Sequence, residues 1–178
     1  MYYVDIILED KLKMRILESN RLILRSWKIS DLDDLHEFMS NKKVATLAGF
    51  NVKNSKEDTL NILKQFIIDS SNSLWAIELK NLNKAIGWIE LRKYSEGIDK
   101  NSKEIGFVLS QGYWGQGLIP EAIKQVLYYG FNEEKLNSII CSHFINNNQS
   151  KRAIEKCCFK YVKKSNDKVY YCLNKNDF

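Results

Sequence analysis

Apolar and polar positions in the first 70 residues change from a strand pattern to a helix pattern. Residues 21–27 (RLILRSW) alternate apolar and polar side chains, which predicts a β-strand. Residues 31–39 and 56–67 carry apolar side chains at helical spacing, and a serine with an acid three residues later precedes each stretch. We therefore predict two helices after the strand, joined by a polar loop at residues 41–54.

The middle of the chain contains three further strand patterns. Residues 74–79 (LWAIEL) and 85–91 (AIGWIEL) are separated by five mostly polar residues, so we predict an antiparallel hairpin. Residues 104–110 (EIGFVLS) read as another strand, and a glycine-rich turn follows it directly. From Pro120 onward the spacing of apolar residues predicts an amphipathic helix with proline in its first turn.

The last third repeats the alternation of strand and helix. We predict a strand at 138–144 and a helix at 147–157, followed by short strands near 159–162 and 169–172. The predicted order is β-α-α-β-β-β-α-β-α-β-β, without a linker or an internal repeat. This order indicates a single α/β (α+β) domain with a mixed sheet.

Composition narrows the classes of function. The 178 residues are 44% hydrophobic and 28% charged, which is typical of a folded globular protein. The net charge of +5 is spread along the chain, which fits an anionic ligand and argues against a dedicated nucleic-acid-binding protein. No apolar run is long enough for a membrane helix, and the N-terminus lacks the features of a signal peptide, so we expect a cytoplasmic protein. Four cysteines without a C-x-x-C motif and only two histidines make a metal site improbable.

The glycine-rich turn is the strongest candidate for a binding site. Three of the eight glycines and the only proline lie within residues 112–120. A dinucleotide fingerprint would need a third glycine where Pro120 stands, and a Walker A loop would need G-K-[ST]. The remaining functional interpretation is a pyrophosphate bound by backbone N–H groups and by the positive end of the following helix. The alternative is that the glycines only form a tight turn.

Four motifs resemble those of the GNAT acetyltransferases, and most closely the Rim-type branch that acetylates ribosomal proteins. They are E-I-G-F at 104–107, W-G-Q-G at 114–117 with a later E-A, N-x-x-S-x-R at 147–152, and K-x-x-F at 156–159. The segment 17–25 (LESNRLILR) is similar to the first strand of that family. The resemblance runs from about residue 14 to residue 172. It implies a GNAT domain at 14–178 with a mostly antiparallel sheet flanked by helices, and an extension at 1–13 of unknown role.

The resemblance also implies a binding site for acetyl-CoA without a metal. The residues that it assigns to the cosubstrate are Phe107, Val108, Leu109, Trp114, Gly115, Gln116, Gly117, Leu118, Ile119, Asn147 and Arg152. Three positions depart from the family pattern. Ile119 stands where glycine or alanine is usual, Cys158 replaces the glycine that ends the last helix, and Ile154 replaces a tyrosine that protonates the thiolate in many members.

The reaction that the resemblance implies is direct acetyl transfer to a primary amine in a ternary complex. Glu104 is then the candidate base, directly or through water, although it could also be a carboxylate with surface pairing only. Ser150 is the available proton donor for the thiolate or, equally, a helix cap. Glu121 fits a role at the helix N-terminus better than one in catalysis. Cys141 and His143 share a strand face but have no evident third group, so we expect them in the core.

The acceptor is not specified by a motif. The resemblance implies either a protein N-terminus, such as that of a ribosomal protein, or a small amine, and a homodimer is compatible with it. We expect no direct contact with nucleic acid or membrane. The acceptor surface should come from residues 41–54 and 94–102. An alternative of another class is a non-catalytic acyl-CoA-binding or regulatory module of the same fold.

Overall fold

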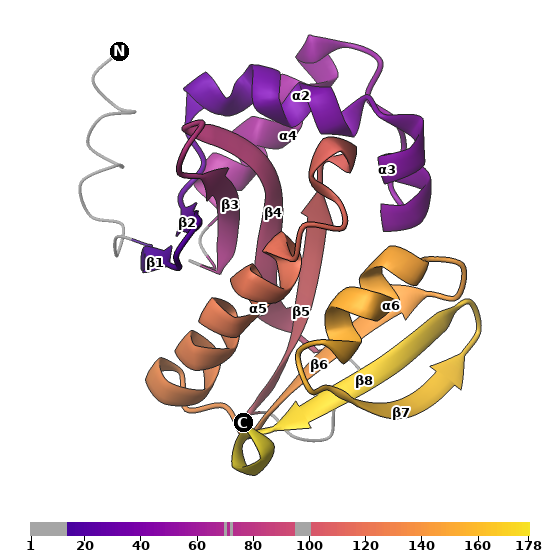
Figure 1. Ribbon diagram of the computed structural model, residues 1–178. Helices are drawn as coiled ribbons and strands as arrows, with labels where there is room; N and C mark the ends of the chain where they lie inside the picture. Colours follow the sequence, from indigo (N-terminus) through magenta and orange to yellow (C-terminus); the bar gives the residue numbers. More distant parts are fainter. Residues whose placement is uncertain (1–13, 70, 72, 95–100) are drawn as a thin grey trace.

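The protein forms one mixed β-sheet with helices on both faces, and the computed structural model describes residues 14–69, 71, 73–94 and 101–178 (Figure 1). Eight strands follow one another across the sheet in the order β1-β2-β3-β4-β5-β6-β8-β7. Their bounds are Leu17–Glu18 (β1), Leu22–Arg25 (β2), Leu74–Leu79 (β3), Lys84–Lys93 (β4), Ser102–Leu109 (β5), Ser138–Phe144 (β6), Lys160–Ser165 (β7) and Lys168–Asn174 (β8).

Five α-helices accompany the sheet in the described part of the chain. They span Leu32–Met39 (α2), Lys42–Ala48 (α3), Lys56–Ile68 (α4), Leu118–Tyr128 (α5) and Asn148–Glu155 (α6), and a π-helical turn at Tyr129–Glu133 extends α5. Short 3-10 turns lie at Ile29–Asp31, Gln111–Tyr113 and Lys175–Asp177. None of the described helices is both long and apolar enough to cross a membrane.

Alternating side chains on the central strands divide the core into two clusters. Ile89 and Leu91 of β4 join the larger cluster, which packs against α5. Trp88, on the other face of β4, joins the smaller cluster formed with α2, α3 and α4. The two faces of the sheet are therefore covered by different helices, as Figure 1 also shows.

The strand and helix order predicted from the sequence is confirmed, with two additions. A two-residue strand, β1, precedes β2, and the helix α3 lies where we predicted a polar loop at 41–54. The side chain of Asn41 accepts hydrogen bonds from the N–H groups of Lys43 and Val44 and so caps the start of α3. Gly49 ends α3 with a left-handed φ of 78°.

The pairing of β5 with β6 creates an opening in the sheet. It is the parallel pair among the described strands, and its register extends only from Ser102↔Ser138 to Ile105↔Cys141. Beyond this point β5 continues through Gly106–Leu109 and β6 through Ser142–Phe144, while β6 stays paired with β8. Figure 1 shows the two strands diverging, with α5 beside β5 and α6 beside β6.

Candidate active site

A cavity of about 430 Å³ lies where β5 and β6 diverge. It is lined by both strands, by the glycine-rich turn, and by residues of α3, α5 and α6. Eleven of the thirteen predicted site residues line it: Phe107, Val108, Leu109, Trp114, Gly115, Gly117, Leu118, Ile119, Asn147, Ser150 and Arg152. Gln116 and Glu104 do not line this cavity.

The glycine-rich turn presents the start of α5 to the cavity. Gly115 and Gly117 have φ angles of 77° and 75°, a region that side chains rarely adopt. A Cβ added at Gly115 would meet no atom within 4 Å, so the space beside it is open. α5 begins at Leu118, two residues before the predicted start at Pro120, and no side chain caps it. Its first N–H groups, which have no acceptor within the helix, thus remain for a ligand.

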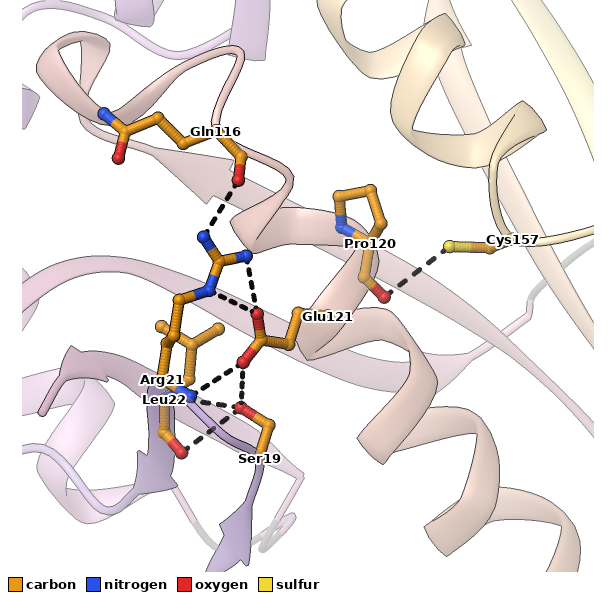
Figure 2. Close-up of polar contacts among 7 residues, drawn as sticks. All are labelled: Ser19, Arg21, Leu22, Gln116, Pro120, Glu121 and Cys157. Atoms are coloured by element: carbon orange, nitrogen blue, oxygen red, sulfur yellow. Dashed lines mark hydrogen bonds and ion pairs between the residues drawn. The ribbon is translucent and has the colours of Figure 1, made fainter.

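The turn is fixed from the opposite side by an ion pair (Figure 2). The guanidinium of Arg21 donates to the Glu121 carboxylate over 2.7 Å and to the Gln116 carbonyl oxygen over 3.1 Å. The Arg21 backbone N–H and the Ser19 hydroxyl donate to the other carboxylate oxygen, at 2.8 and 2.7 Å. Gln116 therefore contributes its carbonyl group to the framework of the turn, and its side chain donates to the Gly112 carbonyl oxygen.

These contacts correct our expectation for Glu121. We expected it to serve its own helix N-terminus, but its carboxylate binds the turn between β1 and β2. Burial alone would raise the pKa of Glu121, but the hydrogen bonds from Ser19 and Arg21 outweigh it, so the pKa is lowered. The carboxylate is held charged and connects α5 to the first strands.

The start of α6 forms another wall of the cavity. Asn147 is the N-cap, because its side-chain oxygen accepts from the N–H of Ser150 over 3.0 Å. Its amide also donates to the Leu47 carbonyl oxygen over 2.9 Å and so ties α6 to α3. Ser150 therefore lies inside the helix and is not its cap. It lines the cavity, as does Arg152. A role of Asn147 in binding the pantetheine arm stays a prediction.

Two of the departures from the family pattern are accommodated. The side chain of Ile119 is buried in the large core cluster, so its branched group packs inward from the start of α5. Cys158 has a left-handed φ of 62° just after α6, the conformation in which glycine is favoured, and it is exposed. A non-glycine residue there costs about 1–2 kcal/mol, which a domain of this size can tolerate.

A group of charged and polar side chains lies on β4, β5 and β6 at the base of the opening. Arg92 donates to the Glu104 carboxylate from Nη2 over 3.2 Å and to Glu90 from Nη1 over 2.9 Å. The Ser142 hydroxyl donates to the second oxygen of Glu104 over 2.8 Å. Both oxygens of Glu104 are thus engaged, and its role as the base stays a prediction.

Glu90 is the acid of this group that lines the cavity, and no sequence motif predicted it. Its side chain is 27% exposed, against 12% for Glu104. It lies across Gly106 of β5: a Cβ at Gly106 would come within 2.7 Å of a Glu90 oxygen. Burial raises the pKa of Glu90, Arg92 opposes the rise, and Glu104 and Asp69 reinforce it. A glycine within a strand was the one available signal, because it indicates a close approach.

The cysteines offer no nucleophile to this site. Cys141 is fully buried, and burial raises its pKa strongly. His143 hydrogen-bonds through its two ring nitrogens to the Phe144 carbonyl group and to the Tyr171 hydroxyl, at 2.8 and 3.5 Å. The expected core placement is confirmed for Cys141, whereas His143 is buried but also lines the cavity. Among the described residues, no group of three or more His, Cys, Asp or Glu side chains could hold a metal ion.

Comparison with known proteins decides the family. The sequence profile of the acetyltransferase (GNAT) domain matches residues 21–160. The chain belongs to the GNAT acetyltransferase family. The uncharacterized N-acetyltransferase YoaA of Bacillus subtilis (strain 168) is 28% identical over 148 residues, which is 82% of either chain. The matched range includes the glycine-rich turn and most of the cavity-lining residues of this GNAT domain.

Solved structures support the same family. A GNAT acetyltransferase from Bacillus anthracis superimposes on this GNAT domain with a TM-score of 0.79 and 27% identity, over 91% of this chain and 99% of that one. A spermidine N-acetyltransferase from Vibrio cholerae, solved with CoA and spermine, has a TM-score of 0.70 at 19% identity over 89% and 98% of the two chains. That likeness shows the shared fold. The protein is therefore an acetyltransferase with the mixed, mostly antiparallel GNAT sheet.

Proposed function

We propose that this GNAT enzyme transfers the acetyl group of acetyl-CoA directly to a primary amine while both substrates are bound. The observation that carries the proposal is the cavity between the diverging strands β5 and β6, with the uncapped start of α5 at its edge. Backbone N–H groups at that helix start would bind the pyrophosphate. Arg152 and Lys156, which also line the cavity, would meet further phosphate charge.

The residues that line the cavity favour direct transfer. A covalent acetyl-enzyme would need an accessible nucleophile such as a thiolate, and no cysteine is among the described residues that line it. Acetyl-CoA supplies the activated acetyl group. The chain would supply a carboxylate that removes a proton from the amine, at Glu90 or Glu104, and Ser150 as a proton donor for the departing thiolate.

Two kinds of primary amine fit the proposed reaction. A protein N-terminus, as the Rim-type resemblance implies, and a small amine are both compatible with a carboxylate beside the opening. An α-amine, with a pKa of about 7.7–8.0, is easier to deprotonate than a lysine side chain at about 10.4. Residues 95–100, part of the segment from which we expected acceptor contacts, lie outside the described residues, whereas α3 lines the cavity.

Release of the CoA thiol in the presence of a panel of amines tests the proposal. The panel should contain 2-phenylethylamine, leucinamide, spermidine, lysine and a short peptide with a free N-terminus. We expect thiol release above the rate without amine for at least one member, with an acetylated amine detected by mass spectrometry. Binding of acetyl-CoA without transfer to any member would contradict the proposed reaction and favour a binding module.

A further inference from the structure

The cavity reaches both faces of the sheet, and the two faces differ in chemistry. Along β5, Phe107 and Leu109 point to the α5 side, where they pack on the large core cluster. Gly106 and Val108 point to the side of α2 and α4, where Val108 is in the smaller cluster. If the cosubstrate enters from the α5 side, as the proposed function requires, the acceptor approaches from the opposite face.

The wall on the acceptor side is aromatic and aliphatic. Trp88 of β4 and Phe50, just after α3, line it with their ring centroids 5.9 Å apart. Val44 and Leu47 of α3 and Phe144 of β6 extend this surface. Such side chains bind an apolar or aromatic group by burial and ring contacts, and they offer few hydrogen-bonding groups to a peptide backbone.

The charged residues that line the cavity also favour an acceptor with an apolar body. Glu90 is the one acid among the described residues that line it, whereas Arg92, Arg152, Lys156 and Lys168 are cations. An acceptor with one ammonium group could pair that group with the Glu90 carboxylate. A polyamine would place its further ammonium groups near other cations and without a second carboxylate, which is unfavourable.

We propose that the acceptor is a monoamine with an aromatic or branched apolar body, and that Glu90 binds its ammonium group and accepts its proton. The apolar body would lie against Phe50 and Trp88. This assignment rests on the proposed function and deepens it. Gly106 is part of the arrangement, because only a residue without a Cβ leaves room for the Glu90 side chain in this position.

The two carboxylates then have different tasks. Glu90 takes one proton from the ammonium group and passes it to solvent. The freed nitrogen lone pair forms the C–N bond with the acetyl carbon, the C–S bond breaks, and its electron pair leaves with sulfur. The second nitrogen proton reaches the thiolate, which gives the CoA thiol. Arg92 lies between the acids, and Glu104 holds it with the support of Ser142, so we regard Glu104 as a positioning residue.

The test compares Glu90→Gln and Glu104→Gln with the unmodified enzyme on 2-phenylethylamine, leucinamide, spermidine and a peptide. In the unmodified enzyme kcat/KM should be highest for the first two amines. Glu90→Gln should lower that kcat/KM by about 100-fold and leave KM for acetyl-CoA unchanged. It should also move the acidic limb of kcat/KM to higher pH, because an enzyme without this base can use only amine that is already deprotonated. In the unmodified enzyme, protonation of Glu90, which Arg92, Glu104 and Asp69 influence, would cause the limb. Calorimetry with CoA present should show weaker binding of 2-phenylethylamine.

The matched control is Glu133→Gln, which also removes a carboxylate paired with an arginine, Arg15, but lies outside the cavity. It should leave all rates unchanged. The proposal is overturned if Glu90→Gln leaves the position of the acidic limb and the affinity for the amine unchanged, if Glu104→Gln alone moves the limb, or if spermidine or the peptide is the preferred acceptor. Transfer to none of the amines would instead contradict the proposed function itself. A thermal melt of each variant separates these results from misfolding.

Discussion

Ser150 occupies the third position of α6, where Asn147 already satisfies its backbone N–H. It also lines the cavity between the diverging strands. Because Asn147 caps the helix, the hydroxyl of Ser150 is not needed as a cap and can act on the ligand. Ile154, the position at which many family members carry a tyrosine donor, is buried in the core and has no proton to give. Ser150 is therefore the residue at which to test protonation of the thiolate.

Ser150→Ala should lower kcat by about 100-fold if the hydroxyl protonates the leaving thiolate. The KM for acetyl-CoA should change little, because the backbone of α6 and the cap at Asn147 stay in place. Steady-state kinetics with the best amine would measure both values, and Gln149→Ala, at a neighbouring position that also lines the cavity, shows how far a nearby truncation alone lowers kcat. An unchanged kcat would mean that water supplies the proton.

For individual residues, the sequence predicted many that line the cavity but not which groups each of them contacts. The motifs around Trp114 and Asn147 identified eleven of the lining residues, because backbone turns and caps have local signatures. Glu90 has no such signature. Its position follows from the register of β4 with β5, which places it opposite Gly106, and register depends on the whole sheet.

Among the helices, α5 depends on an anchor that lies far away in the sequence. Its first turn is fixed by Glu121, whose partners Ser19 and Arg21 lie on the turn between β1 and β2 (Figure 2). The anchor also reaches the glycine-rich turn, through the bond from Arg21 to the Gln116 carbonyl group. Loosening it should therefore disturb both the stability of the fold and the geometry of the proposed pyrophosphate site.

Glu121→Gln should lower the free energy of unfolding by about 1–2 kcal/mol at neutral pH, because the charged hydrogen bonds are lost. It should also weaken binding of acetyl-CoA. Denaturant unfolding and calorimetry would measure the two effects. Glu57→Gln is the matched control, since Glu57 is an exposed acid in the first turn of α4. If both variants lose the same stability, interaction with the helix dipole explains the effect and the anchor does not.

The same variant has a defined pH dependence. The pKa of Glu121 is lowered in the folded protein, so its stabilisation is present above the ordinary glutamate pKa of about 4.3 and is lost as the pH falls below it. The difference in stability between the unmodified protein and Glu121→Gln should therefore shrink below about pH 4. A difference that stays constant to pH 3 would contradict the charged hydrogen bonds.

Prediction of elements succeeded where their patterns were long. The hairpin of β3 and β4 and the strand β6 follow from apolar-rich runs of six or more residues. The seven-residue helix α3 was missed because its apolar stripe is too short to stand out from a polar loop. Its signals were the cap at Asn41 and the glycine at position 49, which are informative only when read together.

For the molecule as a whole, function depends on a place where the sheet is incomplete. The hydrogen-bonded register of β5 with β6 ends at Ile105 and Cys141, and the cavity begins beyond it. The order of strands and helices could be predicted from local patterns. The length over which two parallel strands stay paired could not, because it depends on how α3, α5 and α6 pack around them. A ligand that fills the opening would join both halves of the sheet.

Binding of the cosubstrate should therefore stabilise the entire domain. A ligand at 100 times its Kd adds about 2.7 kcal/mol to the free energy of unfolding, which for a domain of this size raises Tm by about 5–10 °C. We expect this shift with acetyl-CoA and with CoA, and a smaller one with pantetheine, which lacks the phosphates that α5 and Arg152 would bind. Differential scanning fluorimetry would measure it, with NADH as the control nucleotide. An equal shift with NADH, or none with acetyl-CoA, would contradict the assignment of the cavity between β5 and β6 to the cosubstrate, because a site built for its pyrophosphate and arm should distinguish these ligands.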